Sequence, residues 1–310
     1  MNTIERRVFA LSIIALTLIL SMACLSAYIR LASSSIGCLP WPDCQASNYA
    51  IDPEPGIAIT ADDDNRGLRL LHRLMASTFA IVATLLMLTS IWYRQQIHIR
   101  PTLAILCFAL TILLALVGIN TPNILLPAVT LVNLTGGMLT TGIVWLLVLQ
   151  LRNPPANSPM TPRRWLNLAN IGLVTIVIAS GAWVSGNFAA GTCADFLGCG
   201  PLSVEQIADA FNISRELVES DGRLLFSDVR PSIEWGHHFL AILLCISLIV
   251  SATLNYENTG KTAISTLTIA IGLVALGILE EPTLLSAWIH NFWSLLLLLA
   301  VVYQYASSQH

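Results

Sequence analysis

Charged side chains are scarce in this chain of 310 residues. Only 11% of its residues are Asp, Glu, Lys or Arg, whereas a soluble domain carries about 25%. The net charge of −3 offers no extended cationic surface for nucleic acid. Hydrophobic residues make up 55% of the chain, so both a disordered chain and an ordinary soluble enzyme are excluded. We therefore expect lipid to surround most of the protein.

Long apolar runs take the place of the missing charge. A membrane helix needs about 20 mostly apolar residues, and eight stretches of the chain meet this need. They lie at about 8–30, 70–92, 102–120, 126–150, 166–186, 233–254, 263–280 and 284–306. The sequence thus predicts an all-α membrane protein with eight transmembrane helices.

The basic residues are unevenly distributed among the connections. Eight of the 15 precede the first span or follow spans two, four and six, where only Glu5 and Glu257 are acidic. The long connections at 31–67 and 187–230 are acidic and lie on the opposite side. Because basic connections stay in the cytoplasm, we expect both termini to be cytoplasmic and both long loops to be outside.

An internal duplication relates the two ends of the chain. Ala27-Tyr28-Ile29 with Cys38 and Cys44 repeats, at a constant offset of 155 residues, as Ala182-Trp183-Val184 with Cys193 and Cys199. His72 opens the second span as His237 opens the sixth, and Asn133 falls in the fourth span where His290 falls in the eighth. The order of these matches predicts two homologous halves.

Each half holds four spans, so the two halves insert into the membrane the same way round. We expect two tandem four-helix bundles, at 1–151 and 165–310, related by a pseudo-two-fold axis along the membrane normal. The connection 152–164 between them is rich in proline and is predicted to be a cytoplasmic linker.

Four of the seven cysteines form two C-x5-C pairs in the outer loops, Cys38 with Cys44 and Cys193 with Cys199. An oxidising exterior favours disulfides. The pairs are either staples that hold the loops or, because exposed and strained disulfides are labile, redox-active groups. A metal site is less favoured because neither loop contains a histidine. The other three, Cys24, Cys107 and Cys245, lie in spans and are predicted to be small apolar packing residues.

Four histidines fall at membrane depth: His72, His237, His238 and His290. Ionisable residues there are costly, so they are candidates for function. His237 and His290 lie at similar depth near the outer ends of spans six and eight. Two neutral imidazoles on facing helices of a bundle are the arrangement that ligates heme iron axially. In the first half, Asn133 replaces the second histidine, so that half holds heme through His72 alone or holds none.

Two charged residues accompany these histidines. Glu234 lies one turn before His237 on the same helix face, where it either bonds an imidazole or a ligand, transfers protons, or is a solvated acid at a helix start. Arg73 follows His72. It belongs to a group of outer-face arginines that either pair with heme propionates or extend to the interface, namely Arg66, Arg69, Arg73 and Arg230.

These features resemble the heme A synthase family over essentially the whole chain. The resemblance rests on the duplicated halves, the cysteine pairs, Gly181-Ala-Trp-Val-Ser-Gly followed by Ala190-Gly191, and the His-Arg start of the second span. It implies an oxidoreductase of cytochrome oxidase assembly that hydroxylates the methyl group of heme O successively to the formyl group of heme A.

The resemblance also implies the ligands and their sites. A heme b cofactor would be held by His237 and His290 as iron ligands, and heme O would bind as substrate in the first half. The first cysteine pair would serve activity and the second the fold. Partners would be heme O, membrane lipid, heme O synthase and terminal-oxidase assembly factors, in the bacterial inner (plasma) membrane, with homo-oligomers left open and no nucleic acid.

The chain departs from the family pattern in its first half. Arg69 replaces the glutamate of the Glu-x-x-His-Arg motif, Asn133 replaces the histidine of span four, and the Glu-x-x-His pattern appears instead at Glu234 and His237. We expect catalytic roles for Glu234, His72 and Arg73, with His72 also binding cofactor. Either the halves have exchanged roles, or the first half binds heme O without two histidines.

Two other functions remain open at this point. The chain could be a heme-binding paralogue without oxygenase activity, acting in electron transfer or heme handling. It could also be a membrane thiol-disulfide oxidoreductase built on the cysteine pairs.

Overall fold

The computed structural model describes residues 2–33, 66–98, 100–120, 126–156, 159–193, 198–199, 203–214, 229–277 and 283–309. Within these ranges all regular structure is helical. The helices are α1 (Thr3–Ser33), α3 (Arg66–Trp92), α4 (Thr102–Asn120), α5 (Pro127–Arg152), α6 (Pro162–Gly186), α7 (Val204–Ala210), α8 (Arg230–Gly277) and α9 (Leu284–Ser307). Most of the expected outer loop 31–67 and much of 187–230 lie outside the described residues.

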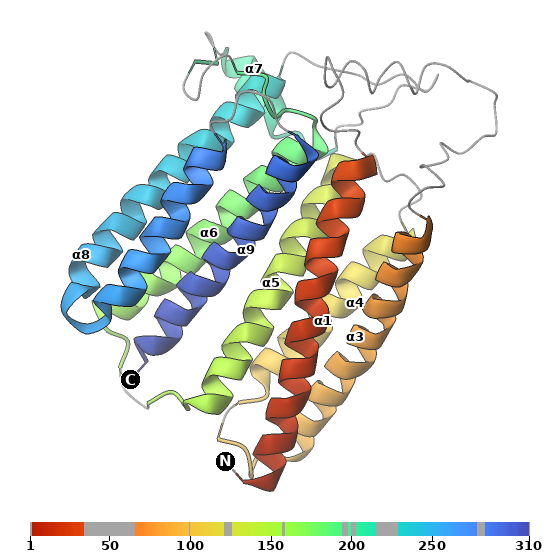
Figure 1. The fold of residues 1–310 in the computed structure, drawn as a ribbon, viewed down its shortest axis with the longest axis vertical. Coiled ribbons are helices and arrows are strands. Elements are labelled where there is room, and N and C mark those ends of the chain that lie inside the picture. The colour runs from red at the N-terminus through yellow and green to blue at the C-terminus, as the bar shows by residue number, and fades with distance from the viewer. Residues whose placement is uncertain are drawn as a thin grey trace.

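Seven of the described helices are long and apolar enough to cross a membrane. They are α1, α3, α4, α5, α6, the stretch Arg230–Leu254 of α8, and α9. Figure 1 shows long helices running roughly alongside one another, with both chain termini at one end and α7 at the other. The prediction of an all-α protein with many membrane-spanning helices is confirmed.

The element α8 is folded back on itself. A straight helix over Arg230–Gly277 would be about 70 Å long, yet both of its ends lie close to His290. The ring of His237, near its start, has its centre 6.4 Å from that of His290, and a Cβ added at Gly277 would lie 3.8 Å from the same ring. Figure 1 shows the two resulting arms side by side.

The arms of α8 correspond to the sixth and seventh predicted spans. The first arm is the span Arg230–Leu254, and the second contains the shorter apolar helix Ile264–Gly277. The predicted seventh span, 263–280, ends among residues that the structure does not describe. The described part of this arm is too short to count among the seven long spans.

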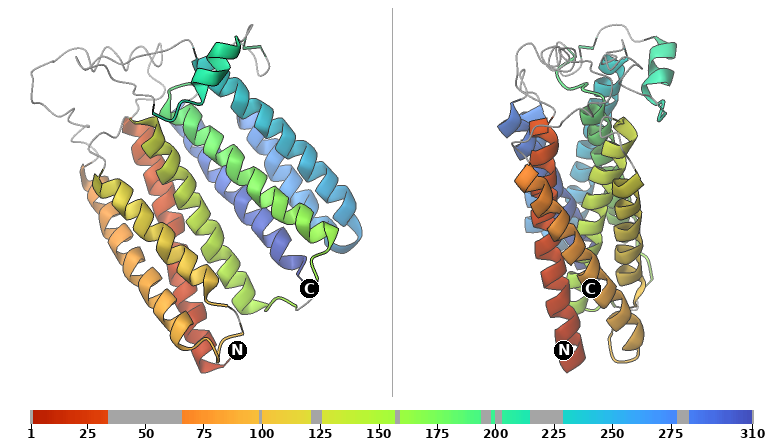
Figure 2. Two further views of the ribbon diagram at one scale, coloured as in Figure 1. Left: turned by 180° about the vertical axis from the view of Figure 1, so that it is seen from behind. Right: turned by 90° about the vertical axis from the view of Figure 1, so that its right-hand side faces the viewer.

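The helices pack in chain order within each half of the sequence. α1 contacts α3 and α5, and α4 contacts α3 and α5, while α8 contacts α6 and α9. Between the halves, α1 meets α9 and α5 meets both α6 and α9, which Figure 2 shows from two further sides. This packing places the starts of α8 and α9 beside the end of α6, where the candidate site lies.

Local signals in the sequence fix where these helices begin. Thr161 caps α6 by accepting a hydrogen bond from the backbone of Arg164, with Pro162 at the first helical position. Thr283 caps α9 through Ser286. A hydroxyl at the N-cap satisfies a backbone N–H that the helix leaves without a partner, and proline is favoured in the first turn.

Candidate functional site

The rings of His237 and His290 face one another between α8 and α9. Their centres are 6.4 Å apart and their planes form an angle of 64°. A metal–imidazole bond is about 2.0 Å long, so two imidazoles on opposite sides of one metal have ring centres about 6 Å apart. The observed separation therefore fits one metal between the two rings.

Ser180 on α6 determines which nitrogen of His237 carries the hydrogen. The Ser180 hydroxyl donates to the carbonyl of Val177 at 2.8 Å, and its oxygen lies 2.8 Å from Nδ1 of His237. A hydroxyl has a single hydrogen, so with that hydrogen on the Val177 carbonyl the second bond assigns the ring hydrogen to Nδ1. The neutral ring then keeps its lone pair on Nε2, the form that binds metal.

Gly181 gives the ring of His237 room to pack against α6. A Cβ at this position would lie 3.1 Å from Cε1 of the ring, which is shorter than ordinary van der Waals contact. Gly181 opens the Gly-Ala-Trp-Val-Ser-Gly motif, so the structure supplies a physical reason for its first residue.

The protein ligands at this site suit a heme better than a bare metal ion. Among the described residues there is no group of three or more His, Cys, Asp and Glu side chains that could hold a metal ion. A porphyrin brings four nitrogens of its own, so heme iron needs only axial ligands from the protein. The pair fits that requirement, and His238 lies beside it with its ring centre 6.3 Å from that of His237.

Glu234 lies one turn before His237, but its carboxylate bonds to a loop. Its carboxylate is 7% exposed and accepts from the backbone N–H of Gly191 at 2.7 Å, the hydroxyl of Thr192 at 2.9 Å and the backbone N–H of Cys193 at 2.7 Å. Gly191 has φ of 72°, a conformation that favours glycine. Glu234 therefore holds the 191–193 loop at the end of α6, close to the histidines.

Replacing Glu234 with alanine should destabilise this loop strongly. The change removes the charged acceptor of three partly buried hydrogen bonds, and hydrogen bonds to charged groups are worth about 1.5–3 kcal/mol each, so we expect a lower unfolding temperature and faster proteolysis within the loop. Thermal unfolding in detergent measures the first effect. Glu205→Ala is the control, because Glu205 is exposed on α7; equal shifts in the two variants would contradict the anchoring role.

Cys193 and Cys199 form a disulfide with their Cα atoms 4.4 Å apart. The predicted bond in the second outer loop is therefore confirmed, and Glu234 anchors it through the backbone of Cys193. The other predicted pair, Cys38 with Cys44, lies outside the described residues. Cys24, Cys107 and Cys245 are free thiols within the helices, where small packing residues were expected.

The first half does not assemble a matching pair of ligands. His72 is half-buried on α3, whereas Arg73 beside it and Asn133 on α5 are exposed. Within the described ranges, no ring contact joins His72 to another imidazole. Among the described residues, the histidines His237 and His290 of the second half are thus brought together, and no second pair of histidines is found in the first half.

Arg30 also lies in this region, although it was not among the site residues predicted from the sequence. Its guanidinium donates from Nη1 to the hydroxyl of Ser185 on α6 and from Nη2 to the side-chain oxygen of Asn291 on α9, the latter at 3.2 Å. The sequence did contain a signal, because Ser185 follows Arg30 by the same 155 residues that separate the repeats.

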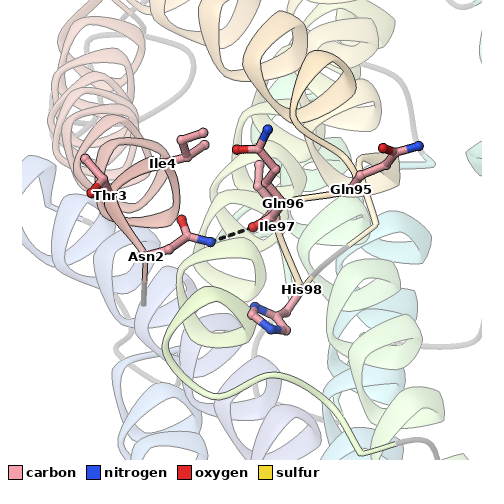
Figure 3. A pocket seen from close by; sticks show the side chains of 7 residues that line it. All are labelled: Asn2, Thr3, Ile4, Gln95, Gln96, Ile97 and His98. Atoms are coloured by element: carbon pink, nitrogen blue, oxygen red, sulfur yellow. Dashed lines mark hydrogen bonds between the residues drawn. The ribbon is translucent and has the colours of Figure 1, made fainter.

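A hollow on the described surface lies at the opposite end of the molecule. Its volume is about 520 Å³, and it is lined by Asn2, Thr3, Ile4, Gln95, Gln96, Ile97 and His98. Figure 3 shows the Asn2 amide donating to the carbonyl of Gln96, a bond of 2.7 Å. Glu5 binds the ring of the largely exposed His98. This hollow contains none of the paired histidines.

Comparison with known proteins adds one finding. A family model described as cytochrome oxidase assembly protein, COX15-CtaA, matches residues 9–302. No curated protein matches the chain closely enough to count as a relative.

Proposed function

Because the chain belongs to the COX15-CtaA family of cytochrome oxidase assembly proteins, the heme A synthase family, we propose that it is a membrane oxidoreductase acting on heme O. It binds heme b between His237 and His290 and converts the methyl group of heme O to the formyl group of heme A by successive hydroxylation. The observation that carries this proposal is the pair of facing imidazoles, 6.4 Å apart.

The chemistry divides between the bound heme and the chain. Heme iron supplies the oxidising power for an unactivated methyl group, which no side chain can provide. Two hydroxylations would oxidise the methyl carbon by four electrons, taken up by an external oxidant such as dioxygen, and the resulting geminal diol would lose water to give the aldehyde. The chain orients His237 through Ser180 and seats its ring on Gly181. Glu234 holds the disulfide-bonded loop close to the site.

The two halves contact one another at or near equivalent positions, which supports a pseudo-two-fold relationship. Arg30 and Ser185 are separated by the repeat offset of 155 residues, and Trp145 donates to the carbonyl of Leu299, three residues before its counterpart Val302. Positions related by a two-fold axis touch only where they lie near that axis. We infer two four-helix halves, 1–151 and 165–310, with the second arm of α8 as the seventh span, α9 as the eighth and 152–164 as the linker.

The orientation follows from the distribution of charge. Eight of the 15 basic residues belong to the end that carries both termini, where only Glu5 and Glu257 are acidic, and basic connections stay in the cytoplasm. We infer a protein of the bacterial inner membrane with both termini inside, which places the paired histidines near the outer face.

The first half is proposed to receive heme O. His72 and Arg73 on α3 are the groups that would hold it there, and Asn133 on α5 stands where the second half supplies a second histidine. The same feature favours a second candidate, a heme-binding paralogue without oxygenase activity. Within the described residues, only the second half presents a complete pair of ligands.

Production in cells that make heme O but no heme A separates these functions. We expect the purified chain to show a low-spin heme spectrum, the pyridine hemochrome to identify heme b, and the cell extract to contain heme A. Heme b without heme A would favour the paralogue. A colourless protein, obtained with ample porphyrin supply, would reject both functions.

A further inference from the structure

Arg30 belongs to the first half of the chain and bonds to residues beside the candidate site of the second half. Its two hydrogen bonds reach Asn291, which follows His290, and Ser185, which lies four residues after Gly181. Four residues are about one helical turn, or about 6 Å along α6. The ring of His237 packs against Gly181, so the guanidinium lies about one turn from this proposed iron ligand. Its other partner, Asn291, is adjacent in sequence to the second proposed ligand, His290.

This guanidinium has no acidic partner among the described residues. The acidic side chains described there are Glu5, Glu205, Asp209 and Glu234, and Glu234 is held by the 191–193 loop. A charge within a membrane span is costly unless it is paired. The two hydrogen bonds to neutral oxygens orient the guanidinium, but they do not neutralise it.

We propose that Arg30 binds a propionate carboxylate of the heme held by His237 and His290. A guanidinium presents N–H groups in a fork that matches a carboxylate, and propionates are the carboxylates that a porphyrin carries. A residue of the first half thereby positions the cofactor of the second half, with Ser185 and Asn291 holding the guanidinium in place. This inference rests on the proposed function, because it requires heme between the two histidines.

The first test is the heme affinity and midpoint potential of the full-length protein carrying Arg30→Gln. Glutamine keeps hydrogen-bonding capacity but removes the charge. We expect about tenfold weaker heme binding. Loss of a positive charge also disfavours the reduced iron, so we expect the ratio of reduced to oxidised heme at fixed potential to fall about tenfold, equal to about 59 mV. Arg7→Gln is the matched control, because Arg7 is exposed at the other end of the same helix.

A second comparison identifies the partner of the charge. The protein is reconstituted with protoheme or with its dimethyl ester, which lacks propionate charges. If Arg30 binds a propionate, Arg30→Gln weakens the binding of protoheme about tenfold and that of the ester less than twofold. Equal losses with both hemes would overturn the proposal. If Arg30→Gln fails to accumulate in the membrane, Arg30→Lys is tested in the same comparison. We then expect a smaller loss of affinity for protoheme and none for the ester.

The outcomes separate this inference from the proposed function. Wild-type protein that shows no low-spin spectrum rejects the heme site itself. Low-spin heme with an unchanged affinity and potential in Arg30→Gln leaves the heme site standing and rejects the role of Arg30.

Discussion

Replacing His237 with alanine should remove the low-spin heme spectrum of the purified protein. The change deletes the ligand whose Nε2 lone pair is left available by the hydrogen bond from Nδ1 to Ser180. We expect heme per chain to fall at least about tenfold, since loss of even a partner that supports a metal ligand costs about 10–100-fold in affinity. His290→Ala should behave alike, because the two rings hold one iron. Absorption spectra and pyridine hemochrome analysis measure both quantities.

Two further variants show whether the effect is specific to the pair. His98→Ala removes a histidine whose side chain is 70% exposed at the terminus end, and it should leave the spectrum unchanged. His72→Ala should also keep the low-spin signal, because His72 lies in the other half. A normal spectrum in His237→Ala would exclude the assigned ligands.

Replacing Gly181 with valine should weaken heme binding at least about fivefold without replacing either proposed ligand. The added side chain would enter space occupied by the ring of His237, because Cε1 lies only 3.1 Å from the position of a Cβ. The ring must then move or the helices must separate, and overpacking of this kind costs about 1–3 kcal/mol. We expect heme content to fall at least about fivefold, which corresponds to about 1 kcal/mol.

Gly172→Val is the matched control for this variant. Gly172 lies on the same helix, and no atom stands within 4 Å of a Cβ added there. The control should therefore bind heme as the wild type does, and both variants should accumulate in the membrane. If the two valine variants lost heme equally, the contact between Gly181 and His237 would not explain the result.

Hydropathy predicted most of the helices because lipid imposes a simple requirement. A span must be apolar over about 20 residues, and this requirement is visible in the sequence without any knowledge of packing. The fold-back of α8 was predicted in the same way, as two separate spans at 233–254 and 263–280.

The pairing of His237 with His290 followed from their similar depth, but the contacts around them did not. Helical spacing placed Glu234 on the face of His237, whereas its carboxylate accepts hydrogen bonds from the 191–193 loop. Backbone N–H groups in that loop need acceptors, and the sequence does not reveal where such a loop will lie. Arg30 was missed for a related reason, since its partners lie 155 and 261 residues away.

The position of the paired histidines along their helices has a consequence for electron supply. Both lie within about the first two turns of α8 and α9, at the end of the molecule opposite the termini. An electron that reached this iron from the terminus side would cross most of the hydrocarbon layer, and moving one charge across it changes the energy by about 2.3 kcal/mol per 100 mV. With a negative potential on the terminus side, reduction of the iron from that side would be electrogenic, and its rate would increase with the membrane voltage. The rate of reduction from the opposite face would depend very little on the voltage.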